Sequence, residues 1–299
     1  MGREEWLSLP YDQWRETRAT LHMYTQVLGK LRLALSPFEP GWANVALYVT
    51  PRGLTTSAVP AGPRIFDAEL DLFDHVLVMR TDDGQVERLP LGGAVADFYR
   101  ETLDGLGRMG IEVAISELPS EVADAIPFPQ DNVHHTYDPV QANRFQRVLC
   151  RVDAVMKEHR AGFAGRTSPV HFFWGSFDMA LTRYSGRPAE VPADAGVIAR
   201  FSGDAEEICA GWWPGDERYP RPAFYAYVHP APEGVQQLAI RPAEAVWDNS
   251  LGEWILPYEA AVSSGDPRGK AREFLSSTYG AAAGSLGWSE RLTRFGKPD

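Results

Sequence analysis

Apolar residues recur at two different periods along the chain, and the change of period separates helices from strands. Between Asp12 and Gly29 they recur three to four residues apart, which predicts a helix capped by Asp12 and stopped at Gly29. Two further helices are predicted to start at Asp138 and Asp266, because each is followed directly by a proline. A shorter helix is expected over residues 95–106.

Strict alternation of apolar and polar residues predicts two groups of strands. The first group covers residues 31–35, 45–49 and 66–72, a hairpin over 74–91 with the turn TDDG, and 111–115. The second group covers residues 170–184, 223–228 and 253–258. Aromatic residues point to both faces of the segment SPVHFFWGSFD, so we predict it as one interior strand of a sheet covered on both sides.

The order of these elements predicts an α+β protein with antiparallel or mixed sheets and flanking helices. Each half contains a long helix, several strands and a shorter helix. We therefore expect one compact domain, residues 1–299, with possible duplicated lobes at 1–118 and 138–299. Residues 119–137 are Pro-rich and irregular, and a connection of this length usually has a function.

Composition and charge narrow the class of protein. The chain is 44% hydrophobic and 23% charged, as globular proteins are, and from its pattern we expect neither a membrane-spanning segment nor a secretory signal. Two cysteines, Cys150 and Cys209, cannot supply a disulfide framework, so we expect a cytoplasmic protein. The net charge of −11 repels phosphate backbones and argues against a nucleic-acid partner.

Residues 168–186, SPVHFFWGSFDMALTRYSG, resemble the signature of an uncharacterised bacterial and fungal family known only as a domain of unknown function. Further segments share the resemblance, among them LPYDQW, DNVHHTYDP, WWPG, AFYAYVHP and FLSSTYGAAA, so it covers nearly the whole chain. The resemblance implies no activity. The family pattern reads Ser-His-Glu where this chain has Asp204, Ala205 and Glu206. If that histidine acts in the family, this chain is a repurposed relative, for instance in biosynthesis.

The segment SPVHFFWGSFD also carries the first candidate site. His171 and Asp178 fall on opposite faces of a flat strand, and a bulge at Gly175 would bring them together. Histidine is the commonest acid–base side chain near neutral pH. One interpretation is a catalytic His171 with Asp178 and Arg183 organising a substrate. The other is a buried polar network that only stabilises the fold.

The loop DNVHHTYD, residues 131–138, is the densest in polar chemistry. We predict that His134, as a further catalytic group, and Tyr137 share one cavity with His171. Alternatively, Asp131 and His134 with His171 could hold a non-haem iron. Adjacent histidines in a loop beside a helix cap more often have no metal role, so we predict no metal.

Three residues of the first helix, Arg18, His22 and Gln26, share one stripe. Such a stripe is typical of a solvated face or of the polar wall of a cleft, and we favour solvent.

Aromatic residues are expected to wall the pocket, namely Trp174, Trp213, Tyr225 and Tyr227. Arg52 is a candidate anion contact. The chain lacks GxGxxG after a strand, GxxxxGKS/T, GxSxG and HExxH, so no nucleotide cofactor is predicted. The leading hypothesis is an enzyme that acts on a small polar or aromatic metabolite by histidine acid–base chemistry. The alternatives are a non-catalytic ligand-binding or accessory protein and a metal-dependent oxygenase of the non-haem iron type.

Overall fold

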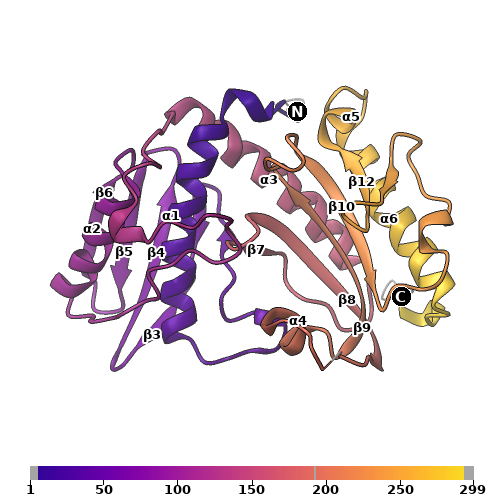
Figure 1. The fold of residues 1–299 in the computed structure, drawn as a ribbon, viewed down its shortest axis with the longest axis horizontal. Helices are drawn as coiled ribbons and strands as arrows, with labels where there is room; N and C mark the ends of the chain where they lie inside the picture. The colour runs from indigo at the N-terminus through magenta and orange to yellow at the C-terminus, as the bar shows by residue number, and fades with distance from the viewer. Residues whose placement is uncertain (1–5, 192, 293–299) are drawn as a thin grey trace, which may run out of the picture.

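Two antiparallel sheets and the helices around them make up the fold of the computed structural model, which describes residues 6–191 and 193–292 (Figure 1). The first sheet has the order β1-β2-β4-β5-β6, with β3 paired to β4, and the second has the order β11-β12-β10-β9-β8-β7. This arrangement confirms the predicted α+β class with antiparallel sheets.

The strands of the first sheet are β1 (Tyr48–Val49), β2 (Gly53–Thr55), β3 (Val59–Ala61), β4 (Arg64–Asp71), β5 (Val76–Thr81) and β6 (Val86–Pro90). Those of the second are β7 (His171–Phe173), β8 (Asp178–Pro188), β9 (Ala205–Trp213), β10 (Ala223–His229), β11 (Val246–Asp248) and β12 (Glu253–Pro257). The helices are α1 (Arg15–Leu35), α2 (Val95–Arg108), α3 (Pro139–Ala161), α4 (Val197–Ser202), α5 (Tyr258–Val262) and α6 (Pro267–Ser285). Within the described residues, five 3-10 turns lie at Tyr11–Gln13 (η1), Pro40–Trp42 (η2), Phe128–Gln130 (η3), Val235–Gln237 (η4) and Glu290–Leu292 (η5).

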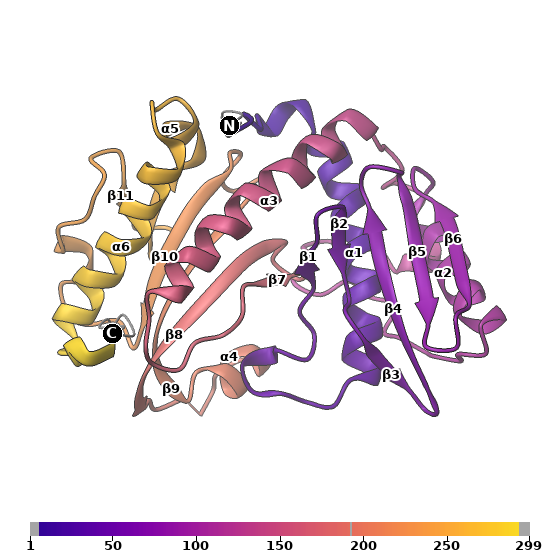
Figure 2. The same ribbon diagram turned by 180° about the vertical axis from the view of Figure 1, so that it is seen from behind.

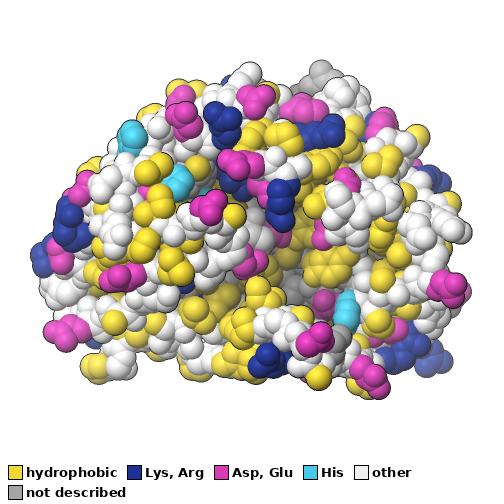
Figure 3. Space-filling view, in the orientation of Figure 1, with side chains coloured by type: hydrophobic (Ala, Val, Ile, Leu, Met, Phe, Trp, Pro, Cys, Tyr) yellow, Lys and Arg dark blue, Asp and Glu magenta, His cyan; other side chains and the backbone are white. Residues whose placement is uncertain are grey.

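The two long helices α3 and α6 cover one face of the second sheet. Figure 2 shows α3 and α6 lying across that face, and the side chains between them are apolar. The opposite face is turned toward α4 and η2 and is the hollowed one in Figure 3. Most buried apolar residues of both sheets belong to one continuous core, and a smaller second cluster, which includes Ala180, Trp213 and Tyr225, lies on the cavity face of the second sheet. Within the described residues, no helix is both long enough and apolar enough to cross a membrane.

The helix α1 departs from the prediction at both ends. Asp12 lies in η1 and does not cap it, since the N-cap position is Trp14 and makes no side-chain cap bond. Gly29 does not stop the helix, which continues to Leu35 through the segment predicted as a strand. A Cβ atom on Gly29 would overlap the Trp174 indole, so this glycine serves close packing inside the helix.

Other predicted boundaries are confirmed where local signals decide them. The Asp138 carboxylate accepts hydrogen bonds from the first turn of α3, and Asp266 accepts one from Gly269 at the start of α6. The β5–β6 hairpin, β4, β10, β12 and α2 also lie where predicted. Residues 111–115, expected as a strand, are irregular.

The segment SPVHFFWGSFD is not one interior strand. It forms β7, a turn over residues 174–177 and the start of β8, so only β8 is interior and β7 ends the sheet. Both faces of β7 carry aromatic residues because Phe172 packs in the core against Phe177, whereas Phe173 lies beside His171 on the cavity face. The edge of β7 is paired as well, since Leu47 and Phe172 exchange backbone hydrogen bonds of 2.9 and 2.8 Å. The turn also means that no bulge is needed to put His171 and Asp178 on one face.

Candidate functional site

A cavity of about 1350 Å³ lies on the face of the second sheet that the helices leave open (Figure 3). Alternate residues of four strands form its floor, since every second side chain of a strand points the same way. These residues are His171, Phe173, Asp178, Ala180, Thr182, Tyr184, Glu207, Cys209, Trp213, Tyr225 and Tyr227. Glu253 of β12, the turn η2, residues of α4 and the loop residue Glu121 also belong to the lining.

Asp178 is the centre of a hydrogen-bonded group in this cavity. Its carboxylate accepts hydrogen bonds from the Ser176 hydroxyl and the Tyr225 phenol. The Tyr225 ring reaches Asp178 by lying across Gly211 of the intervening strand, where a Cβ would overlap it. Burial raises the pKa of the Asp178 carboxyl, and burial together with Asp178 raises the pKa of Tyr225.

His171 lies on the same face as Asp178, but no hydrogen bond joins them. His171 is opposite Ala180 in the β7–β8 ladder, so Asp178 is its diagonal neighbour across the two strands. The Cα atoms of such diagonal neighbours are about 7–8 Å apart. The imidazole packs edge-on against Tyr48 and Phe173, and its Nε2 has no hydrogen-bond partner among the described residues. Burial, with a smaller contribution from Arg32, lowers its pKa to about 4, so the ring is neutral at neutral pH.

The cavity lining contains four carboxyl groups that were not predicted from the sequence, on Glu121, Asp204, Glu207 and Glu253. Burial, with Asp204 nearby, raises the pKa of Glu207 to about 7. Burial likewise raises the pKa of Glu253 to about 7, with Asp178 nearby. Neither side chain makes a hydrogen bond or an ion pair with any described residue. A signal for Glu207 exists in the sequence, because it alternates with Cys209 and Trp213, so that this carboxyl shares one strand face with apolar side chains.

Arg183 points away from the cavity. Its neighbours along β8, Thr182 and Tyr184, line the cavity, so the alternation of the strand directs Arg183 to the helix-covered face. There its guanidinium lies over the rings of Phe163 and Tyr279, at 5.0 and 4.4 Å from their centroids. It also donates to the His159 carbonyl. Arg183 therefore packs in the core and does not contact a ligand in this cavity.

The loop residues His134 and Tyr137 lie beside the first sheet and α2. His134 Nδ1 is 2.7 Å from the Asp131 carboxylate, and the His134 carbonyl accepts from the backbone N–H of Val95. The Tyr137 hydroxyl is 2.8 Å from His75 Nδ1. Neither residue lines the cavity, so the structure does not bring them to His171. The same connection reaches the cavity at its other end, through Ser120 and Glu121.

The alternative metal ligands are not assembled. The part of the chain that the structure describes contains no group of three or more His, Cys, Asp or Glu side chains that could hold a metal ion. Asp131 and His134 pair with each other, while His171 lies in the cavity.

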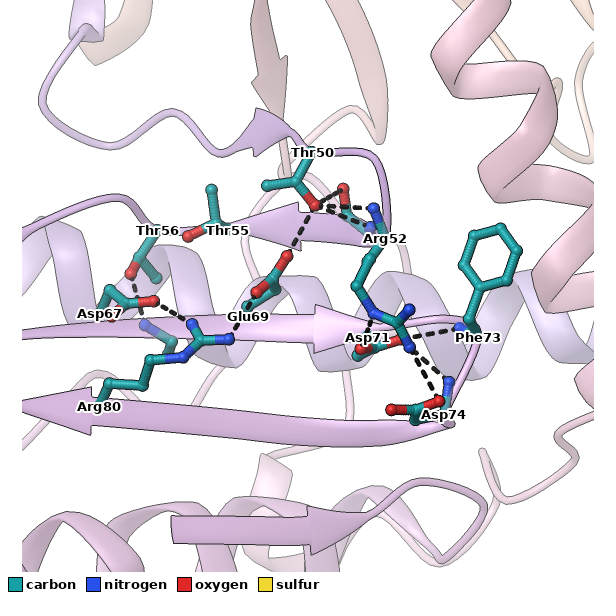
Figure 4. A network of polar contacts seen from close by, with 12 residues as sticks. Thr50, Arg52, Thr55, Thr56, Asp67, Glu69, Asp71, Phe73, Asp74 and Arg80 are labelled. Carbon is teal, nitrogen blue, oxygen red and sulfur yellow. Dashed lines mark hydrogen bonds and ion pairs between the residues drawn. The ribbon is translucent and has the colours of Figure 1, made fainter. Parts of the chain in front are cut away.

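Arg52 lies in the turn between β1 and β2 of the first sheet (Figure 4), and it does not line the cavity. Its guanidinium pairs with Asp71 at 2.5 Å and with Asp74 at 2.8 Å. A neighbouring network in the same view joins Arg80 to Asp67 and Glu69. The positive charge of Arg52 is thus already engaged by two carboxylates.

The polar stripe of α1 is buried, contrary to the solvated face that we favoured. His22 Nε2 lies 2.9 and 3.0 Å from the carbonyls of Trp174 and Gly175, while Gln26 hydrogen-bonds to the backbone of Ser120. Burial lowers the pKa of His22 to about 3. The stripe therefore holds the β7–β8 turn and the Ser120 loop, both of which line the cavity. Trp174 also lines it, with its indole N–H donating to the Val45 carbonyl at 2.9 Å.

Ala205, which stands where the resembled pattern has histidine, begins β9 and lines the cavity beside Asp204 and Glu207. The model of a family of unknown function, DUF5996, matches residues 6–294. No curated protein and no solved structure gives a significant match. Because the family model covers nearly the whole chain, the chain belongs to this family of unknown function.

Proposed function

We propose that the chain binds a small metabolite in the cavity of the second sheet and transforms it by acid–base chemistry. The observation that carries this proposal is the set of buried proton-carrying groups on one aromatic-walled cavity. Binding sites for small molecules are typically apolar clefts with a few placed polar groups, and perturbed pKa values concentrate at such sites.

The roles follow from the pKa values. A group whose pKa lies near the working pH exists in both protonation states, so it can both give and take a proton. Glu207 and Glu253, with pKa values of about 7, meet this condition. We assign the acid–base role to them, with neutral His171 as a hydrogen-bonding group and Asp178–Tyr225 as an orienting pair.

A binding protein without catalysis is the second candidate. Both oxygens of Asp178 are already occupied by Ser176 and Tyr225, as they are in carboxylates that only stabilise a fold. The location that we propose for either activity is the cytoplasm, which agrees with two free cysteines and a net charge of −11.

A metabolite screen followed by mass spectrometry tests the proposal. Compounds that raise the melting temperature of the wild type are incubated with it, and their conversion is measured. The variant Glu207→Gln should bind the ligand but lose turnover by roughly a hundredfold, the usual effect of removing an acid–base group. Glu206→Gln is the matched control, since this neighbour does not line the cavity and pairs with Arg187.

Two outcomes would contradict the proposal. Ala180→Phe fills the cavity from its floor, so a ligand that binds this variant as tightly as the wild type does not occupy the cavity. Full turnover by both Glu207→Gln and Glu253→Gln would exclude the assigned acid–base role. Binding without conversion of any ligand by the wild type would favour the second candidate.

A further inference from the structure

We propose that the ligand of this cavity is an organic cation, an amine or quaternary ammonium compound, whose charge lies over Tyr227 between Glu207 and Glu253. This inference rests on the proposed function, because it names the chemical class of the molecule that the cavity takes.

The first support is a buried carboxyl group without a counter-ion. Glu207 is only 8% exposed, faces the cavity and makes no hydrogen bond or ion pair with any described residue. An unpaired carboxylate is costly to bury, so such a group is either protonated or becomes ionised when a cation binds beside it.

The groups that face Glu207 do not supply that cation. They are Tyr184 on β8, Cys209 on β9, Tyr227 and His229 on β10, and Asp204 before β9. The histidine in this set, His229, has its Nε2 3.1 Å from the Gly203 carbonyl. None of these neighbours therefore provides a positive charge for the Glu207 carboxyl. The raised pKa of Glu207, about 7, agrees with this.

The arginines that line the cavity either form ion pairs with other carboxylates or are exposed to solvent. Arg187 pairs with Glu206 at 2.6 Å, and Arg218 pairs with Asp216 at 2.7 Å. Arg166 is exposed and makes no ion pair with Glu207. The interior of the cavity thus carries carboxyl groups without matching positive charge.

The second support is the aromatic floor. Tyr225 and Tyr227 stack with centroids 6.4 Å apart and planes 4° apart, and both rings line the cavity. The face of an aromatic ring attracts a cation, most strongly where water is excluded. On β9, Tyr227 pairs with Cys209. On the other side of β10, Ala226 pairs with Trp254 of β12, so the next residues along this register, Tyr227 and Glu253, lie side by side. Carboxyls on both sides of a ring face are the surroundings that an ammonium group requires.

Two pairs of probes that differ in charge but hardly in shape test this proposal. Choline is compared with 3,3-dimethylbutan-1-ol, and 1,4-diaminobutane with butane-1,4-diol, by calorimetry on the full chain near pH 7. In at least one pair we expect the cation to bind about tenfold or more tightly than the alcohol, which corresponds to about 1.4 kcal/mol. Glu207→Gln and Glu253→Gln should each reduce that preference about threefold or more, whereas Glu206→Gln should preserve it.

Proton release gives an independent readout. A bound cation favours the ionised form of Glu207, so binding near pH 7 should expel protons, seen as a heat that depends on the ionisation enthalpy of the buffer. Glu207→Gln should lower this release while remaining folded.

Equal affinity for cation and alcohol in both pairs, or absence of binding by all four probes, would overturn the proposal. Binding of an alcohol alone, blocked by Ala180→Phe, would reject the cation and still support a ligand cavity. The two failures are therefore distinguishable.

Discussion

Gly211 shows how one residue without a side chain shapes the candidate site. It lies between Tyr225 on β10 and Ala180 on β8, and its bare Cα leaves the space through which the Tyr225 ring reaches Asp178. A Cβ there would overlap both the ring and the Met179 carbonyl. The backbone carbonyl cannot rotate away as a flexible side chain can, so the conflict must be relieved by moving the strands or the ring.

We therefore expect Gly211→Ala to lower the free energy of unfolding by about 1–3 kcal/mol, the usual cost of overpacking. Denaturant unfolding measures this. Tyr225→Phe is the control, because it removes only the hydroxyl that donates to Asp178 and should cost about 1 kcal/mol. A Gly211→Ala variant as stable as the wild type would show that the ring does not need this space.

At the scale of elements, α1 and the β7–β8 turn depend on each other. Gly29 lets the Trp174 indole approach the helix. About two helical turns before Gly29, His22 hydrogen-bonds to the carbonyls of Trp174 and Gly175 in the β7–β8 turn. A glycine inside a helix is usually a cost of roughly 1 kcal/mol relative to alanine. In α1 the packing of the Trp174 indole offsets this cost, because the indole occupies the position that the methyl group of an alanine would take.

Two glycines inside long helices should consequently respond in opposite ways to alanine. Gly29→Ala should destabilise the protein, since the new methyl group would overlap the indole of Trp174. Gly280→Ala, in α6, meets no atom within 4 Å and should stabilise it by about 1 kcal/mol. Thermal unfolding of the two variants decides, and stabilisation by both would contradict the packing described.

Helix capping provides a second matched pair. The Asp138 carboxylate accepts hydrogen bonds from the backbone N–H groups of Val140 and Gln141, so Asp138→Ala should cost about 1 kcal/mol. Asp12 caps no helix, and Asp12→Ala should change stability by less than about 0.5 kcal/mol. Equal losses in denaturant titrations of the two variants would show that α3 does not rely on its cap.

Across the whole molecule, buried histidines and buried carboxyls oppose each other as pH changes. His22 and His171, with pKa values lowered to about 3 and about 4, stay neutral in the fold while the unfolded chain takes up protons below about pH 6.5. Stability due to them rises with pH up to that value. Glu207 and Glu253 hold protons in the fold up to about pH 7, whereas the unfolded chain releases them near 4.5. Stability due to them falls as pH rises through that window.

The double variant Glu207→Gln/Glu253→Gln should reveal how the two histidines contribute to the pH dependence of the unfolding free energy. Between pH 5 and 6.5 the wild type should show a shallow dependence of unfolding free energy on pH, because the two slopes cancel in part. The double variant should become more stable with rising pH, by up to about 1.4 kcal/mol per pH unit for each histidine. Urea unfolding at several pH values measures both curves, and parallel curves would contradict the raised carboxyl pKa values.

The sequence by itself determined the features that depend on neighbours along the chain. The Asp-Pro starts of α3 and α6, the β5–β6 hairpin and the strands β4, β10 and β12 rest on local capping, turn chemistry and alternation, and all were predicted. Alternation also placed Tyr225 and Tyr227 on one face, and both line the cavity. Membership of a family of unknown function was recognisable from motifs spread over the chain.

Only the tertiary structure decided which of the polar residues meet. A turn of four residues after β7 reverses the chain and puts His171 and Asp178 on one face, although strict alternation separates them. Contacts between segments far apart in sequence decide where three of these residues lie. Arg183 packs over Tyr279 in the core, the His134 carbonyl binds the start of α2, and Glu253 lies beside Tyr227. The role of Gly29, which lies inside α1 and packs against the Trp174 indole, likewise depends on a residue far away in sequence. A periodic pattern states which way a side chain points from its own element, but the packing of elements decides what lies there.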